Sequence, residues 1–295
     1  MSDSKQVIQH FRGRFLHRED GPAVIYSDGG EEYYFLGRLH RYNGPAVSYP
    51  TGEQIYYKFG RLHRLDGPAH INAKGSIRYY IEDRLHRDNG PAVIHPDGCV
   101  KYYSNGRLHR TDGPAIIEAD GTMRYYRGGQ AHRADGPAVI HPSGRMSYYF
   151  QGKLHRNDSG MGDGPAIIHP GGGEEYYVHG VRHRDSKDGP AIIHPNKYIK
   201  YYSNGVLHRT DGPAVIYNDG KEEWYLYGEL IRTSSFDLVL DPDCDLDLDR
   251  EMEQHYRSIV KIMDQEPAPL ANDWFKEAKE WCIKFGNESA IVHCV

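Results

Sequence analysis

The residues that could do chemistry in this chain recur in one short motif, a histidine followed by an arginine. The histidines of the motif fall at positions 17, 40, 63, 86, 109, 132, 155, 183 and 208, and the first six intervals are all 23 residues. Regularly spaced imidazole and guanidinium groups could bind phosphates or acidic proteins. The candidate anion-contact residues are His17, Arg18, His40, Arg41, His63, Arg64, His86, Arg87, His109 and Arg110.

The same column has a structural interpretation, which we favour. A position filled identically in all nine units should serve what every unit does, which is to pack against its neighbours. Asp20 follows Arg18 by two residues, and acidic or amide residues follow most of the other arginines. Local ion pairing or stacking on tyrosine could therefore satisfy the guanidinium. The sequence leaves both interpretations open.

The spacing disfavours other chemistry. Equivalent histidines in adjacent units would lie about 10 Å apart, whereas zinc ligands lie about 2.1 Å from the metal. The chain lacks the common hydrolase, phosphate-loop and metalloprotease motifs, and repeated units rarely build an asymmetric catalytic pocket. We therefore expect no enzyme activity, no catalytic residue, no metal and no cofactor. A net charge of −5 also argues against nucleic acid as the partner.

The motif is part of a longer repeat, H-R-x-[DN]-G-P-A-[VI]-I-x-x-x-G-x-x-x-Y-Y-x-x-G-x-L. Gly-Pro-Ala recurs nine times and Tyr-Tyr eight times, with Trp224-Tyr225 closing the series. Each unit predicts a β-hairpin: a β-branched strand, a glycine turn, and a strand that carries the tyrosines. One such hairpin cannot bury its apolar face alone, so stability should come from stacking of neighbouring units. The 24 tyrosines, 33 glycines and mean hydropathy of −0.73 fit such thin layers.

We predict an all-β fold, a β-hairpin repeat solenoid of nine units of about 23 residues, with a small α-helical C-terminal segment. Residues 1–16 should be an N-terminal half-repeat, and residues 17–235 the array. Residues 236–295 carry 14 acidic and 6 basic residues and read as an acidic linker with a two-helix cap over the last strand edge. Their alternating aspartates lack the central glycine and final glutamate of a calcium loop.

The places where the repeat departs from its own pattern indicate a partner site. Two consecutive units have longer loops after His-Arg, Arg182 replaces the usual leucine, and Lys197 replaces a turn glycine. Loops on one face of a repeat array commonly bind partners, although neutral variation in a tolerant loop is an equal alternative. The candidate partner-binding residues are Asn157, Asp158, Met161, Arg182, Asp185, Lys187 and Lys197.

The repeat resembles the MORN repeat (membrane occupation and recognition nexus), in the variant form whose units carry H-R-x-D-G-P-A-V-I. The resemblance covers residues 17–231 and the half-unit before them. It implies protein scaffolding, dimerisation and, in some members, binding to anionic lipids. The variant is similar to proteins multiplied in large DNA viruses of amoebae and in some bacteria and phages. His-Arg stands here where the usual unit has His-Gly.

The expected function is that of a non-enzymatic scaffold that mediates protein–protein interaction or assembly, with a virus-encoded structural or host-interaction protein as one form. The partner is a protein, self-association included. Peripheral binding to an anionic phospholipid membrane through the His/Arg edge is the alternative. Four widely spaced cysteines without a Cys-x-x-Cys pair, and no apolar leader, indicate a cytoplasmic protein, in the host cytoplasm or the virion if viral.

Overall fold

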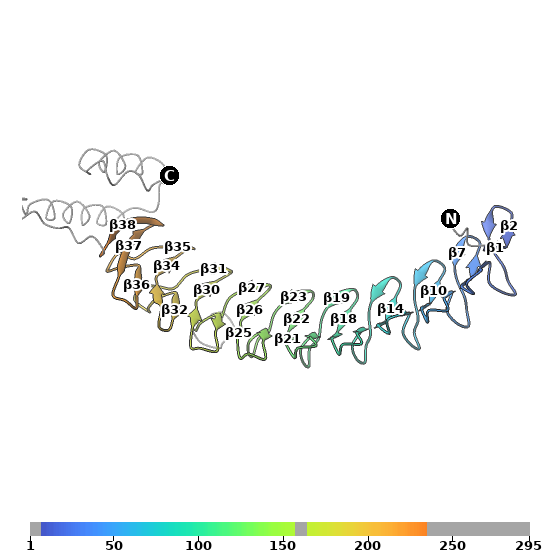
Figure 1. Ribbon diagram of the computed structural model, residues 1–295, viewed down its shortest axis with the longest axis horizontal. Helices are drawn as coiled ribbons and strands as arrows, with labels where there is room; N and C mark the ends of the chain where they lie inside the picture. The colour runs from blue at the N-terminus through green and yellow to red at the C-terminus, as the bar shows by residue number, and fades with distance from the viewer. Residues whose placement is uncertain (1–6, 157–163, 235–295) are drawn as a thin grey trace, which may run out of the picture. The chain divides into compact units, whose positions relative to one another are not determined.

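The computed structural model describes residues 7–156 and 164–234, and these residues form repeated β-hairpins. The predicted all-β fold is confirmed. One antiparallel sheet of 20 strands runs through all nine units, in which successive hairpins lie side by side in chain order (Figure 1). The first strands of the nine hairpins are β4 (Val24–Tyr26), β8 (Val47–Ser48), β12 (His70–Ile71), β16 (Val93–Ile94), β20 (Ile116–Ile117), β24 (Val139–Ile140), β28 (Ile167–Ile168), β32 (Ile192–His194) and β36 (Val215–Tyr217).

Each first strand pairs with the second strand of its own unit and with the second strand of the unit before it. In the fourth unit, Val93 of β16 faces Lys101 on one side and Arg78 on the other. Gly98 makes the turn between the two strands with φ of +90°, a conformation that residues with a Cβ resist. The second strands are β5 (Glu31–Glu32), β9 (Gln54–Ile55), β13 (Ile77–Arg78), β17 (Val100–Lys101), β21 (Met123–Arg124), β25 (Met146–Ser147), β29 (Glu174–Glu175), β33 (Tyr198–Lys200) and β37 (Glu222–Leu226).

The chain makes a second, smaller hairpin in the half-unit and in the first eight units, which the sequence pattern did not separate from the first. The first tyrosine of each pair leaves the long sheet, and the second tyrosine begins a two-stranded sheet of its own. These small hairpins are β2 (Phe11–Arg12) with β3 (Phe15–Leu16), β6 (Tyr34–Phe35) with β7 (Arg38–Leu39), β10 (Tyr57–Lys58) with β11 (Arg61–Leu62), β14 (Tyr80–Ile81) with β15 (Arg84–Leu85), β18 (Tyr103–Ser104) with β19 (Arg107–Leu108), β22 (Tyr126–Arg127) with β23 (Gln130–Ala131), β26 (Tyr149–Phe150) with β27 (Lys153–Leu154), β30 (Tyr177–Val178) with β31 (Val181–Arg182), and β34 (Tyr202–Ser203) with β35 (Val206–Leu207).

The core is a column of small residues. The alanine of every Gly-Pro-Ala triplet is 0% exposed. Its carbonyl accepts a hydrogen bond from the first tyrosine of the preceding unit, or from His10 in the first unit. Tyr102 N–H, for example, donates to the Ala115 carbonyl at 2.7 Å. The residue after the alanine is buried in eight of the nine units, as Val24 and Val215 illustrate. A core this thin depends on contacts between units, since no unit encloses apolar residues by itself.

The two ends of the long sheet differ from its middle. At the N-terminal end, β1 (Val7–Gln9) supplies the second strand of a half-unit and pairs only with β4. At the other end, β38 (Glu229–Thr233) runs straight back along β37, with Trp224 opposite Arg232. Ile231 stands where the other units have histidine, so the chain does not turn into another His-Arg loop. The exposed edge is thus β38, and Trp224 lies behind it.

The contacts divide the chain into Met1–Ser234 and Ser235–Val295. The expected acidic linker and two-helix cap at residues 236–295 lie outside the described residues, as does the beginning of the half-repeat at residues 1–6. No helix in residues 7–156 or 164–234 has the length and apolar character of a membrane span.

Candidate functional site: two arginine rows and a terminal apolar cluster

The histidine of every His-Arg motif accepts a hydrogen bond from the next small hairpin. In the fourth unit, Nδ1 of His86 accepts from the backbone N–H of Asn105 at 3.1 Å. The same bond occurs in all nine units at 3.1–3.4 Å. A ring nitrogen that accepts must carry no proton, so each imidazole is neutral with its hydrogen on Nε2. The histidine column therefore ties each His-Arg loop to the turn of the following small hairpin.

The turn that donates to the histidine contains two residues of positive φ, and the hydrogen bond to the histidine holds the first of them in that conformation. Asn105 and Gly106 have φ of +48° and +79°, the left-handed pair of a type I′ hairpin turn. The histidine fixes the first of these residues by its N–H. Burial lowers the pKa of His40, His132 and His208, which favours the neutral form that the hydrogen bond requires.

The arginine of the motif is held by three kinds of contact, as Arg110 illustrates. Its Cζ lies 4.0 Å from the ring centroid of Tyr102, in the preceding unit. Its Nε donates to Asp112 at 2.8 Å and its Nη1 to the Pro114 carbonyl at 3.4 Å. Arginines in eight of the nine units stack on a tyrosine at 3.7–4.2 Å, namely Arg41, Arg64, Arg87, Arg110, Arg133, Arg156, Arg184 and Arg209. We call these eight arginines, together with Arg18, the inner row.

The glycine of Gly-Pro-Ala makes room for the inner row. A Cβ added at Gly113 would lie 3.0 Å from Arg110 Cζ, and one at Gly67 would lie 2.8 Å from Arg64 Cζ. These distances are shorter than ordinary carbon–carbon contacts. The glycine is thus required because the guanidinium lies flat between it and the tyrosine ring of the preceding unit.

The inner row contains the arginines that the sequence offered as anion contacts. The ion pairing and tyrosine stacking expected from the structural interpretation are both present, the ion pairs in the five units of Arg18, Arg64, Arg110, Arg133 and Arg209. These five side chains are 17–29% exposed. An incoming anion would have to displace the aspartate. Anion contact at the inner row stays a prediction.

A second row of arginines lies on the small hairpins and is exposed. Arg38, Arg61, Arg84 and Arg107 occupy the same position in four successive units, two residues before the histidine. Among the described residues, only Arg61 of these four forms an ion pair, with Glu82 at 2.8 Å. The stem of each arginine lies over the turn of the next unit, as Arg84 Cβ lies 3.8 Å from where a Cβ on Gly106 would stand. We call these four residues the outer row.

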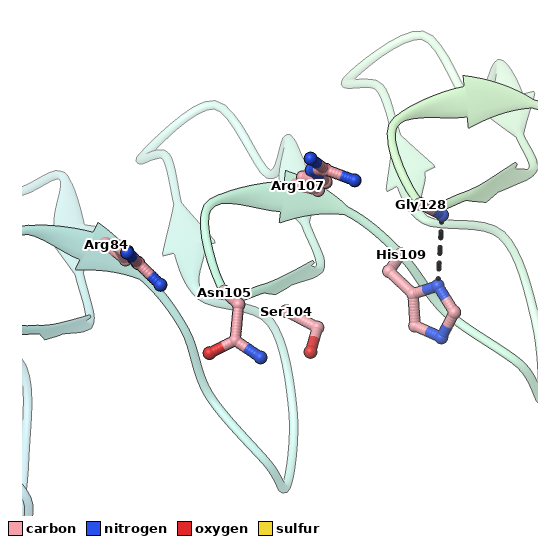
Figure 2. A pocket seen from close by; sticks show the side chains of 6 residues that line it. All are labelled: Arg84, Ser104, Asn105, Arg107, His109 and Gly128. Carbon is pink, nitrogen blue, oxygen red and sulfur yellow. Dashed lines mark hydrogen bonds between the residues drawn. The ribbon is translucent and has the colours of Figure 1, made fainter.

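Figure 2 shows Arg84 and Arg107 of the outer row beside a groove that runs along successive small hairpins. The groove has a volume of about 370 Å³ and is lined by Arg84, Ser104, Asn105, Arg107, His109 and Gly128. Arg84 and Arg107 come from neighbouring hairpins, and the dashed line joins His109 to the amide of Gly128. The groove is open and polar, so it suits an extended charged segment better than a small apolar ligand.

Exposed apolar side chains gather on the small hairpins of the first units. Phe15, Phe35, Leu36 and Phe59 are all exposed, and Phe35 and Phe59 have ring centroids 6.2 Å apart. Phe15 lies against Gly37 of the following hairpin. Tyr42, which is 79% exposed, lies in the adjoining loop with its ring 6.5 Å from that of Phe59. We call these five residues the terminal apolar cluster.

The terminal apolar cluster has no counterpart in the middle units of the described array. The turn position of Leu36 and Phe59 is filled in the later units by Glu82, Asn105, Gly128, Gln151, His179, Asn204 and Tyr227. Exposed apolar patches on soluble proteins commonly mark interaction sites. This cluster gives one end of the array a surface that the regular units lack, next to Arg38 and Arg61 of the outer row.

The structure places the predicted partner-binding residues on separate segments. Arg182 Nε donates to the Tyr177 hydroxyl at 2.9 Å, and the Asp185 carboxylate accepts the N–H of Lys187 at 3.0 Å. Lys197 lies in the turn between β32 and β33, where its carbonyl accepts the Asn218 amide. No hydrogen bond or ion pair joins Arg182, Asp185–Lys187 and Lys197 to one another in the described chain. The predicted residues Asn157, Asp158 and Met161 lie outside it.

No family model and no curated protein matches this chain. The resemblance to MORN repeats therefore depends on the motif alone and stays a hypothesis. Within residues 7–156 and 164–234, no three histidine, cysteine, aspartate or glutamate side chains gather into a possible metal site. The outer row and the terminal apolar cluster are the two exposed surfaces that could bind a partner.

The sequence reasoning missed both surfaces, although their signals were present. Arg38, Arg61, Arg84 and Arg107 recur at one position, but Gln130, Lys153 and Val181 follow them there, so the repeat pattern treated the position as variable. The terminal apolar cluster is visible as Phe-Leu-Gly and Lys-Phe-Gly in place of the polar turns of later units. A search for variable positions that keep one charge in successive units would have found the outer row.

Proposed function

We propose that this chain is a non-enzymatic scaffold that binds a protein partner along the exposed side of its small hairpins. The observation that carries the proposal is the contrast between the two arginine rows. Arg110 is stacked, hydrogen-bonded and ion-paired, whereas Arg107, three residues before it, is exposed and without an ion pair among the described residues. Charges that the fold does not use remain available to a partner.

The repetition supports a binding role. Two strands per unit at about 4.8 Å each place equivalent side chains about 10 Å apart, so the outer row offers the same cation to an extended partner several times. Several weak contacts on one rigid support add to a larger total affinity. The terminal apolar cluster supplies what a repeated surface lacks, a place that occurs once and can fix the register.

A quantitative pull-down tests the proposal. The full chain is compared with Arg84→Ser/Arg107→Ser and with the charge-matched control Lys74→Ser/Lys153→Ser, whose two lysines are also exposed, using lysate from the source of the gene and mass spectrometry. Because the outer-row side chains lie on the surface, the variant should fold normally. We expect a set of proteins to be retained by the wild-type chain and by the control and lost by the outer-row variant. Equal retention by all three chains would contradict a role for the outer row.

A second candidate function is peripheral binding to an anionic membrane, favoured by the same exposed arginines. Each cation near an anionic surface contributes on the order of 1 kcal/mol, and salt screens the attraction. Vesicles containing phosphatidylserine separate the two candidates. Binding that disappears at moderate ionic strength and in Arg84→Ser/Arg107→Ser would support the membrane. The absence of vesicle binding at low salt would exclude the membrane and favour the protein partner.

A further inference from the structure

We infer that the terminal apolar cluster and the adjoining outer-row residues Arg38 and Arg61 bind the acidic segment at residues 236–249 of a second copy of this chain. The inference rests on the proposed partner-binding role and names one partner. It combines three observations: an exposed surface that is both apolar and cationic, a segment of matching chemistry, and a length that prevents the two from meeting within one chain.

The surface joins two kinds of side chain on the same hairpins. Phe35 and Leu36 lie in the hairpin β6–β7 that also carries Arg38, and Phe59 follows Lys58 in the hairpin that carries Arg61. The pairing Lys58↔Arg61 puts two cations directly opposite each other. Glu82 neutralises one of them through its contact with Arg61. The other cations face solvent beside exposed rings, a combination that a segment both acidic and apolar would satisfy.

The segment at residues 236–249 has this chemistry. Its sequence is F-D-L-V-L-D-P-D-C-D-L-D-L-D, with six aspartates, five of which stand at every second position from 241 to 249.

 Glu251, just beyond the segment, keeps the same two-residue spacing. In an extended chain, side chains two residues apart point to the same side. The aspartates from 241 to 249 would then form one face, with Leu246 and Leu248 on the other.

The length of the chain excludes binding within one molecule. From β5, next to the hairpin of Arg38, to β37 the sheet order contains sixteen strand steps, or roughly 75 Å at about 4.8 Å per step. From β9, next to Arg61, the same count gives fourteen steps, or roughly 67 Å. The 15 residues from Ser234 to Asp249 span at most about 50 Å. A second copy must therefore supply the segment.

Charge reversal in the full-length chain tests the inference by sedimentation velocity at low and moderate salt. Arg38→Glu/Arg61→Glu reverses the surface, and lysine at Asp243, Asp245, Asp247 and Asp249 reverses the segment. Lys74→Glu/Lys153→Glu is the matched control, because it reverses two exposed cations that lie outside the apolar cluster. Circular dichroism confirms that each variant is folded.

We expect the wild-type chain and the control to self-associate at low salt, and each reversed variant to associate at least tenfold more weakly. A chain with both reversals should regain association, because the cations and carboxylates have exchanged places. Wild-type chain that stays monomeric at high micromolar concentration, or a doubly reversed chain that stays as weak as the single variants, would overturn the inference. Neither result would affect the pull-down that tests the scaffold proposal, so the two can fail separately.

Discussion

The guanidinium of Arg110 lies 4.0 Å from the ring centroid of Tyr102, a residue of the preceding unit. The chain between them turns through a small hairpin, and the backbone N–H of His109 bonds to the Tyr102 carbonyl at 3.1 Å. One stacking contact therefore joins the loop of one unit to the strand of the one before it. Its repetition along the array makes the most polar motif of the sequence part of the packing between units.

Replacement of Arg110 should affect stability, whereas replacement of Arg107 should not. Arg110→Ala removes the stacking on Tyr102 and the bonds to Asp112 and Pro114, so we expect the free energy of unfolding to fall by about 1–2 kcal/mol. Arg107→Ala removes an exposed charge and should change it by less than about 0.5 kcal/mol. Urea unfolding of both variants provides the measurement. Equal losses would show that the two rows are not distinct.

The glycine of Gly-Pro-Ala should be coupled to the inner row. Gly113→Ala places a methyl group 3.0 Å from Arg110 Cζ and should displace the guanidinium, at a cost of about 1 kcal/mol. In an Arg110→Ala background these closest contacts, all with the Arg110 guanidinium, are removed, so the same substitution should cost much less. A double-mutant cycle measures this coupling. Additive effects would mean that Gly113 is required for a reason other than Arg110.

Acid should weaken the array before it protonates the aspartates. Burial holds the pKa of His40, His132 and His208 below the usual value of 6.5. Between the folded and unfolded pKa values the unfolded chain binds more protons, so the free energy of unfolding rises with pH. The contribution of these histidines is therefore complete above about pH 6.5 and is lost as the pH falls through their folded values.

Urea unfolding between pH 7.5 and 5 measures this loss. The carboxylates titrate in a separate window, because hydrogen bonds from arginine hold the pKa of Asp66, Asp112 and Asp135 below 3.8. Nitrogen chemical shifts of the imidazoles serve as the independent check, since Nδ1 should be unprotonated in the folded chain at neutral pH. Constant stability over this range, or protons on Nδ1, would contradict the histidine contacts described above.

Much of the fold could be predicted from the sequence because the same types of turn and strand residue recur from unit to unit. Gly98 predicts a turn with positive φ, and the β-branched Val93 and Ile94 predict the strand before it. The second hairpin of each unit could not be predicted as a separate sheet. The break falls at the first tyrosine of the pair, whose amide bonds to an alanine of the next unit, and no local pattern encodes that long-range bond.

The candidate surfaces were harder to predict, since exposure depends on neighbouring units. Arg107 and Arg110 have the same side chain three residues apart, and only the tyrosine of the preceding unit distinguishes them. The sequence did indicate both fates for Arg110, and the repetition of the column in all nine units favoured ion pairing and stacking over anion binding. The terminal apolar cluster is a departure from the pattern at the first units, whereas the partner site predicted from the sequence lies at the departures in later units.

Those later departures lead to the last prediction, on Arg182. Its guanidinium is 43% exposed and bonds to the Tyr177 hydroxyl at 2.9 Å, with Glu175 at 3.5 Å. Arg182→Leu restores the residue that most other units carry, and Glu175 keeps its contacts with His169 and Tyr177. The free energy of unfolding should therefore change by no more than about 1 kcal/mol. Capture should fall at least tenfold if the partner binds the irregular units, as the sequence predicts, and should not change if it binds the outer row. Thermal unfolding and a quantitative pull-down, with Lys153→Leu as the charge-matched control, measure the two effects. Undiminished capture by a folded Arg182→Leu chain would move the recognition site away from the irregular units, toward the outer row and the terminal apolar cluster.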